Sequence, residues 1–235
     1  LTGKHTFGHE LLDWSTGYSY ATRHMPDRRK YLIDDALERD GYALSNGNDV
    51  SRDGTQLDEH IFSMSVNDRH EFHFGSWQPF LKMGAYGEYR TRKYNTREFI
   101  YSWNANDNTL PSDFRYENIT ELLSNKENYG ADKLYLLEES QMRNNYRGHN
   151  TQGAGYLAMS FPFGRLNAYA GVRFEHNDMD LISNTKDNEV SEVIQHYRNN
   201  DHFPSLNATF QYKEKHQLRF SYGKTVNRPE FREVS

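Results

Sequence analysis

The feature that most constrains the fold of this chain is a strict alternation of apolar and polar residues between Leu166 and Glu175. The apolar members occupy every second position: Leu166, Ala168, Ala170, Val172 and Phe174. The positions between them carry Asn167, Tyr169, Gly171, Arg173 and Glu175. Successive side chains of a β-strand point to opposite faces, so this period predicts a strand with one apolar face and one polar face.

The same pattern recurs often enough to predict about seven strands. The other six cover approximately residues 12–24, 62–74, 81–103, 157–161, 206–213 and 218–223. Short connections around 75–79, 163–165 and 213–216 join neighbouring segments, which predicts antiparallel hairpins.

Three longer connections, rich in Asn, Asp, Arg and Glu, alternate with these short turns. They span 25–58, 104–149 and 183–202, and within the second, Glu117 to Glu127 is expected to form a helix with Ile119, Leu122 and Leu123 on one side. Short turns at one end of a sheet and long polar loops at the other are typical of outer-membrane β-barrels, whose long loops are extracellular.

The composition supports this interpretation. The chain has 235 residues, and only 35% are hydrophobic, with a mean hydropathy of -0.99, yet 14% are aromatic. Disordered chains are poor in aromatic residues, whereas membrane barrels combine a polar interior with aromatic girdles. No apolar run is long enough for a transmembrane helix. The net charge of -5 gives no electrostatic footprint for nucleic acid, and the absence of cysteine excludes disulfides and thiolate metal sites.

A soluble antiparallel β-sandwich also alternates apolar and polar residues. Two observations favour the barrel: several predicted strands exceed ten residues, and their polar faces mix Tyr, Arg, Glu and Gly, which suits a wet lumen. One segment breaks the pattern, because Asp68 and His70 fall on the apolar face of residues 62–74. Either a bulge changes the register there, or this stretch leaves the membrane.

Several strings resemble barrel strands of TonB-dependent outer-membrane receptors, in the variant found in Bacteroidetes-type bacteria. They are GAGYLAM at 153–159, LNAYAGVRFE at 166–175, FPSLNAT at 203–209 and LRFSYGKTVNRPEF at 218–231, in the order and spacing of that family. Weaker similarity extends upstream over residues 14–20 and 81–85, so the resemblance covers most of the chain except the loops.

The resemblance implies an all-β antiparallel transmembrane barrel of about twenty-two strands with long extracellular loops. We expect residues 1–235 to be a partial barrel, with the plug domain, the TonB-binding segment, the export signal and the remaining strands outside this sequence. The implied function is active uptake of a scarce nutrient across the bacterial outer membrane: a siderophore, haem, cobalamin, a glycan or a peptide. The implied partners are outer-membrane lipid, TonB, the nutrient and a surface lipoprotein. Two alternatives remain open: a non-transporting barrel acting as an adhesin or scaffold, and a soluble all-β binding module.

The candidate site residues are five charged side chains on the polar faces of the predicted strands: Arg90, Arg92, Arg173, Glu175 and Arg219. They are expected either to contact the plug or line the substrate path, or to form cross-strand ion pairs that keep buried charge neutral. Arg228, which precedes Pro229, is expected to mark the end of a strand.

No enzymatic activity, metal or cofactor is expected. Ser63, Ser65 and Ser76 lie near histidines but lack the glycine pattern of a nucleophile elbow. His70 and His73 differ by three positions, which places them on opposite faces of a strand, so a metal site there would require a break in the strand.

Overall fold

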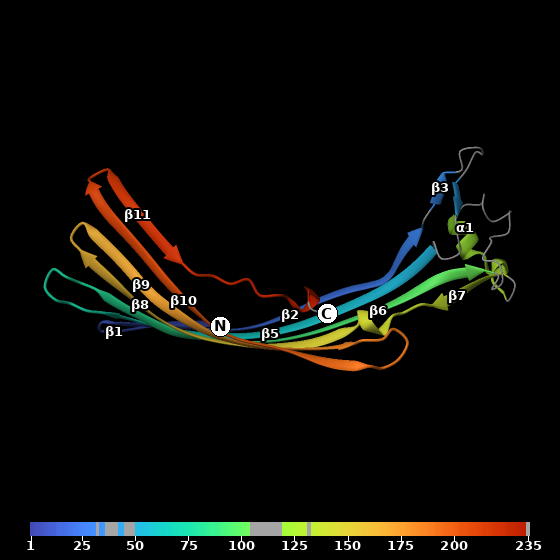
Figure 1. Ribbon diagram of the computed structural model, residues 1–235, viewed down its shortest axis with the longest axis horizontal. Helices are drawn as coiled ribbons and strands as arrows, with labels where there is room; N and C mark the ends of the chain where they lie inside the picture. The colour runs from blue at the N-terminus through green and yellow to red at the C-terminus, as the bar shows by residue number, and fades with distance from the viewer. Residues whose placement is uncertain (32, 36–41, 45–49, 104–118, 131–132, 234–235) are drawn as a thin grey trace.

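The computed structural model describes residues 1–31, 33–35, 42–44, 50–103, 119–130 and 133–233, and most of these form one antiparallel sheet of nine strands. The strand order is β1-β2-β5-β6-β8-β9-β10-β11, with β7 also paired to β6. The bounds are β1 Thr2–Phe7, β2 Glu10–Tyr31, β5 Val50–Glu71, β6 Phe80–Trp103, β7 Leu134–Glu138, β8 Tyr146–Phe163, β9 Leu166–Asn184, β10 Glu192–Lys213 and β11 His216–Gly223. The sheet is a curved trough (Figure 1), and its edges, β1 and β11, do not pair with each other among the described residues.

The connections β1–β2, β5–β6, β8–β9 and β10–β11 gather at one end of the trough, and β2–β5, β6–β8 and β9–β10 at the other (Figure 1). The turn between β8 and β9 has two residues, and its Gly164 has a φ of 56°. A positive φ is costly for any residue with a Cβ, which is why glycine begins this turn. We call the two ends of the trough the turn end and the loop end.

The seven predicted strands are present as β2, β5, β6, β8, β9, β10 and β11, and the predicted antiparallel hairpins are confirmed. The sequence pattern missed β1 and β7, which are short, and a separate two-stranded ribbon of β3 (Ile33–Asp35) and β4 (Tyr42–Leu44). A strand of three to six residues contains too few alternations to be distinguished from a loop.

The predicted loop boundaries were wrong at the loop end, where the strands continue well beyond the apolar pattern. β2 extends past His24 to Tyr31 through a register shift between Met25 and Arg28, and β5 begins at Val50. The connection predicted over 183–202 is mostly hairpin, since only residues 185–191 separate β9 from β10. In these extensions both faces are largely polar, so hydrophobic periodicity cannot reveal them.

The break in the apolar pattern of β5 is not a bulge. The pairing of β5 with β6 continues without a register shift from Ser51 to Glu71, so Asp68 and His70 stay on the face they share with Val66. One row of paired residues across the sheet runs through Leu206, Ala170, Met159, Leu81, His70 and Glu10. The same row is therefore apolar on some strands and polar on others, which means that the band of apolar side chains on this face crosses the rows at an angle. On β5 this apolar band ends before Asp68. This agrees with the second of the two explanations, a stretch beyond the apolar band.

Two small clusters of buried side chains occur near the loop end. The first joins Val50, Tyr101 and Leu134 to Leu122 of helix α1 (Ile119–Ser124), a shorter helix than the one predicted over 117–127, followed by a 3-10 turn at Lys126–Asn128. The second holds Tyr146, Met179, Leu181 and Phe231. Among the described residues, no helix has the length and apolar character needed to span a membrane.

Candidate functional site on the concave face

The two faces of the sheet differ sharply in chemistry. On one face, side chains that are in register across β8 to β11 form an apolar band. The large side chains of this band are exposed: Leu157, Phe163, Leu166, Phe174, Leu206, Phe210, Leu218, Phe220 and Tyr222. The same face of β2, β5 and β6 adds Tyr18, Tyr20, Phe62, Met64, Val66, Met83 and Tyr89. The opposite face is polar and carries the candidate residues. The segment after β11 runs along this polar face, on the concave side of the trough (Figure 1).

Charged side chains of alternating sign cross the middle of the concave face. We call this set the charged belt; it consists of Glu59, Glu88, Arg90, Arg92, Arg173, Glu175, Asp201, Arg228 and Glu230. The belt spans β5, β6, β9 and β10 and the segment after β11. Neighbouring members pair both within a strand and between elements, so the belt brings many charges close together with little net charge.

The first half of the belt is built on β5 and β6. Arg92 donates to Glu59 with a nitrogen–oxygen distance of 2.9 Å, and both side chains are nearly buried. Arg90 pairs with Glu88 at 3.1 Å, and Glu88 also accepts a 2.5 Å hydrogen bond from the hydroxyl of Tyr86. Each carboxylate thus has a charged or phenolic donor, as groups withdrawn from water require.

The second half of the belt is built around Glu175 on β9. Its carboxylate accepts hydrogen bonds from Arg173 at 2.6 Å and from Gln152 at 3.2 Å. Arg228 lies between two strands, with one terminal nitrogen 2.7 Å from Glu175 and the other 2.9 Å from Asp201 on β10. The guanidinium fork therefore ties the segment after β11 to two strands at once.

Four of the five predicted site residues come together in this belt, and one does not. Arg90, Arg92, Arg173 and Glu175 contribute to it, whereas Arg219 lies on exposed β11 near the turn end, opposite Thr209. Of their ion pairs, Arg92–Glu59 joins two neighbouring strands, whereas Arg90–Glu88 and Arg173–Glu175 each join two residues of one strand.

The sequence analysis misplaced Arg228. It does not end a strand, because β11 stops at Gly223, and residues 224–230 form no strand. The pattern that suggested a strand end was the restriction that Pro229 places on the residue before it. That restriction also suits an extended, unpaired chain crossing a sheet. No local signal identified Asp201 as its partner, because the two lie 27 residues apart in the sequence.

Phe231 anchors the end of this segment. It begins a short 3-10 turn at Phe231–Glu233 and is only 3% exposed, packed against Tyr146, Met179 and Leu181. Gly148 makes room for the ring: a Cβ built at this glycine would lie 2.5 Å from the Phe231 side chain. Arg228 and Phe231 together hold residues 228–231 against the concave face, and we call this stretch the strap.

A cavity of about 810 Å³ lies beside the strap on the concave face, toward the loop end. Six basic side chains contribute to its wall: Arg23, Arg28, Lys30, Arg92, Arg143 and Arg232. Three acidic side chains do so: Asp53, Glu98 and Glu230. We call this the basic cavity. It was not predicted, because its residues come from β2, β5, β6, the 3-10 turn at Met142–Asn144 and the strap.

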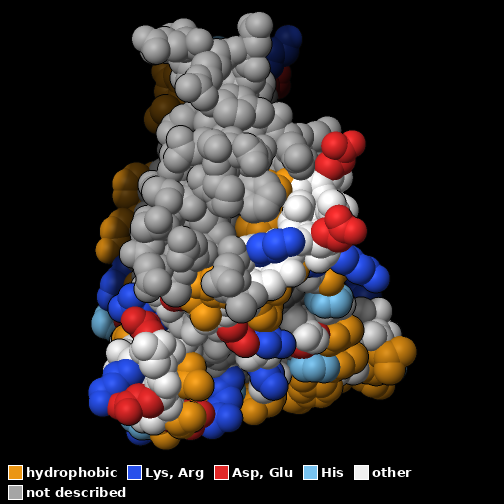
Figure 2. Space-filling model, turned by 90° about the vertical axis from the view of Figure 1, so that its right-hand side faces the viewer, with side chains coloured by type: hydrophobic (Ala, Val, Ile, Leu, Met, Phe, Trp, Pro, Cys, Tyr) orange, Lys and Arg blue, Asp and Glu red, His pale blue; other side chains and the backbone are white. Residues whose placement is uncertain are grey.

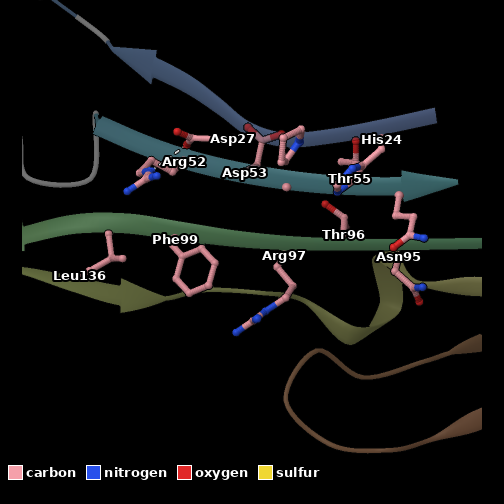
Figure 3. A pocket seen from close by; sticks show the side chains of 13 residues that line it. His24, Asp27, Arg52, Asp53, Thr55, Asn95, Thr96, Arg97, Phe99 and Leu136 are labelled. Carbon is pink, nitrogen blue, oxygen red and sulfur yellow. Dashed lines mark hydrogen bonds and ion pairs between the residues drawn. The ribbon is translucent and has the colours of Figure 1, made fainter.

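A second cavity, of about 420 Å³, lies where β2 shifts register against β5, and Figure 3 shows its wall. Asp27 and Arg52 pair there at 2.7 Å, and Phe99 and Leu136 line the side formed by β6 and β7. Hydrogen bonds from Arg52 and Arg29 lower the pKa of Asp27 from 3.8 to about 2. Seen from the loop end, basic, acidic and histidine side chains are interspersed among apolar ones (Figure 2).

The two histidines singled out from the sequence have different partners in the structure. His70 pairs with Glu10 at 2.5 Å. The ring of His73 contacts that of His9 in a tilted arrangement, with 4.5 Å between ring centroids. In the part of the chain that the structure describes, no group of three or more His, Asp and Glu side chains is arranged to hold a metal ion.

A large antiparallel sheet with an exposed apolar band on one face and a charged concave face is the wall of a transmembrane β-barrel. Comparison with known families agrees: residues 121–235 match the outer membrane protein beta-barrel family. No curated protein matches the chain significantly. The chain is part of a β-barrel of the bacterial outer membrane.

Proposed function

We propose that the chain forms part of the barrel wall of a TonB-dependent receptor that imports a scarce nutrient. The observation that carries the proposal is the combination of an open nine-stranded sheet with a charged, hollowed concave face. Barrel diameter grows with strand number, and the interior of an eight-stranded barrel is just filled by side chains. Eight of the strands lie side by side and still form an open trough, which therefore indicates a wider barrel with a wet lumen.

The remaining strands of such a barrel must come from outside this sequence. Open strand edges leave backbone groups without partners, which lipid does not tolerate. On this proposal the apolar band faces outer-membrane lipid and the charged belt faces the lumen. There the belt, including Arg90, Arg92, Arg173 and Glu175, contacts an internal plug domain. TonB acts through a segment outside residues 1–235, and the chain itself has no enzymatic role. The strings that resemble TonB-dependent receptors support this assignment over other wide barrels.

The main alternative is a barrel that does not transport and serves as an adhesin or scaffold in a surface complex. The mixed charges at the loop end (Figure 2) are compatible with a protein partner such as a surface lipoprotein. The charged concave face favours transport, because a scaffold places no demand on its lumen beyond solubility.

Deleting the gene for the full-length protein in its native bacterium tests the proposal. The deletion strain would compete with its parent in media limited separately for iron, haem, cobalamin, defined glycans or peptides. We expect a loss of fitness in one medium only, with no additional loss when TonB is also removed. Equal fitness in all media, together with loss of adhesion or of a surface complex, would establish the scaffold. Recovery of the full-length protein from lysate without detergent would support the soluble module instead.

A further inference from the structure

We propose that the basic cavity binds an anionic group, a carboxylate or a phosphate, on the nutrient that this receptor imports. The inference rests on the proposed function and adds the chemical class of the ligand. It arises from the cavity's position on the concave face, its excess of cations and its volume.

Some cations of the basic cavity have a carboxylate of their own: Arg92 pairs with Glu59, and Arg143 pairs with Asp187 at 2.7 Å. Arg28 and Lys30 have only one between them. Asp53 is shared, lying 2.8 Å from Arg28 and 3.6 Å from Lys30. Arg23 has no carboxylate within ion-pair distance among the described residues, and its guanidinium contacts the sulfur of Met25 at 3.3 Å. Positive charge in a hollow of limited water access attracts anions, and arginine binds carboxylate and phosphate oxygens in pairs.

The charged heads in the cavity are accessible. The side chains of Arg28 and Lys30 are 50% and 52% exposed although both pair with the buried carboxylate of Asp53, so an incoming anion can reach them from solvent. Arg92 is different, because it is only 13% exposed and is held by Glu59. We therefore assign ligand contact to Arg23, Arg28 and Lys30, and a structural role to Arg92.

The cavity also has the size and composition of a small-molecule site. Its volume of about 810 Å³ falls within the range usual for ligand pockets. Tyr94 and Tyr146 stack in its wall with 5.4 Å between ring centroids, providing an aromatic surface beside the cations. This combination suits an organic acid or a phosphorylated compound. A site for a neutral glycan would instead need many hydrogen-bond acceptors and no excess of cations.

The chain as a whole has a net charge of -5, so a basic lining is not the consequence of a generally basic surface. The cations of the cavity are therefore a local concentration of positive charge in a chain that is acidic on balance. Such local contrast concentrates a charged ligand at one site and makes its binding dependent on salt.

Binding can be measured on the full-length protein purified in detergent, with citrate and inorganic phosphate as probes and sorbitol as the neutral control. Isothermal titration calorimetry would compare the wild type with the double variant R23Q/K30Q. A matched control, R165Q/K215Q, removes one arginine and one lysine from exposed turns at the opposite end of the sheet. Heat-dependent mobility on gels would verify that each variant is folded.

We expect citrate or phosphate to bind and sorbitol not to bind. R23Q/K30Q should weaken the anion Kd by about tenfold or more, because two charged hydrogen-bond donors are lost. R165Q/K215Q should leave the Kd within about twofold of the wild type. Absence of binding by either anion, or equal weakening by both double variants, would overturn the inference.

Failure of this inference can be separated from failure of the proposed function. If the growth competition shows TonB-dependent uptake of a neutral nutrient and neither anion binds, the transporter stands and the anion site is wrong. If an anion binds through Arg23 and Lys30 but no nutrient-dependent fitness loss occurs, the site stands and the transporter is wrong.

Discussion

Asp27 illustrates at the residue scale how the polar extensions of the strands are held together. It lies near the loop end, and it accepts hydrogen bonds from Arg52 at 2.7 Å and from Arg29 at 3.1 Å. These donors favour the carboxylate and lower the pKa of Asp27 from 3.8 to about 2. Because the folded-state pKa is the lower one, the pair stabilises the fold above the ordinary pKa and loses this effect as the pH falls through about 2.

A carbon-13 NMR titration of the Asp27 carboxyl in the full-length protein should therefore show a midpoint near pH 2. The R52Q variant removes the principal donor and should move the midpoint upward. An unchanged midpoint in R52Q would mean that the Asp27–Arg52 pair does not form in solution.

Gly148 is a position where a single methyl group should have a measurable effect. An added Cβ would lie 2.5 Å from the Phe231 ring and 3.1 Å from the carbonyl oxygen of Asp180, and a ring in a packed cluster cannot move aside easily. We expect G148A to destabilise strap docking by about 1–3 kcal/mol. The chain has no cysteine, so a single cysteine in place of Met179, which is 5% exposed in the cluster with Phe231, can report release of the strap by its rate of thiol labelling.

Gly153 provides the matched control, since it is on the same strand and a Cβ there meets nothing within 4 Å. G153A should label at the wild-type rate. Faster labelling in G153A than in G148A would contradict the packing of Phe231 against Gly148.

At this scale the sequence predicted which residues carry charge on the polar face but not how they pair. The alternation assigns Arg173, Glu175 and Arg219 to the polar faces of their strands, because the side chains of a strand repeat every two residues. It cannot show that Glu175 meets Arg228 or that Arg219 remains at the turn end. Those contacts depend on the path of the strap, which has no periodic pattern.

At the scale of elements, α1 packs on the sheet near the loop end, where the short strand β7 pairs with β6, and we call α1 and β7 together the layer. Leu122 of α1 is 1% exposed and Leu134 of β7 is fully buried, and both pack with Val50 and Tyr101 of the sheet. A helix of six residues is too short to be stable alone, so it depends on this cluster.

We expect L122A to destabilise this layer by about 2–5 kcal/mol while the main sheet stays folded. Hydrogen exchange monitored by mass spectrometry should show faster exchange over residues 119–138 only. L137A on β7, where the side chain is 41% exposed, should leave exchange unchanged. Faster exchange across the whole sheet in L122A would show that the layer is not an independent unit.

Sequence analysis located strand centres well and strand ends poorly, and the reason is physical. The predicted end of the third strand, near Trp103, is confirmed by β6, whose pattern continues with Phe99 and Tyr101 on one face. β9 and β10 instead continue through pairs such as Asp178 with Arg198, which stabilise the hairpin without any apolar contrast. Cross-strand ion pairs extend a sheet just as apolar pairs do, but they resemble a loop in sequence.

At the scale of the whole molecule, the apolar band determines where the sheet can lie in a bilayer. Leu157 is 50% exposed within the band on β8, whereas Thr151 lies on the same face beyond its last apolar residue. A charge placed near the middle of a bilayer costs about 2–4 kcal/mol, and one near the interface costs about 0–1 kcal/mol.

L157K should therefore reduce the amount of full-length protein assembled in the outer membrane and lower its unfolding midpoint in urea. T151K should assemble almost as well as the wild type. Equal assembly of the two variants would mean that Leu157 does not face lipid and that the band has been assigned to the wrong surface.

The length of the strands has a consequence for how the protein meets its surroundings. β5 and β10 each have 22 residues, and about 9–11 residues suffice to cross a bilayer. Part of the rest lies at the turn end, where Asp68 and His70 are beyond the apolar band, and the remainder forms a collar of paired strands at the loop end. With the loop end facing outward, as the proposed function requires, proteases and antibodies approaching an intact cell would meet these paired strands. The basic cavity, at the loop end, would sit within this collar, so an anion bound there would be held outside the depth of the lipid.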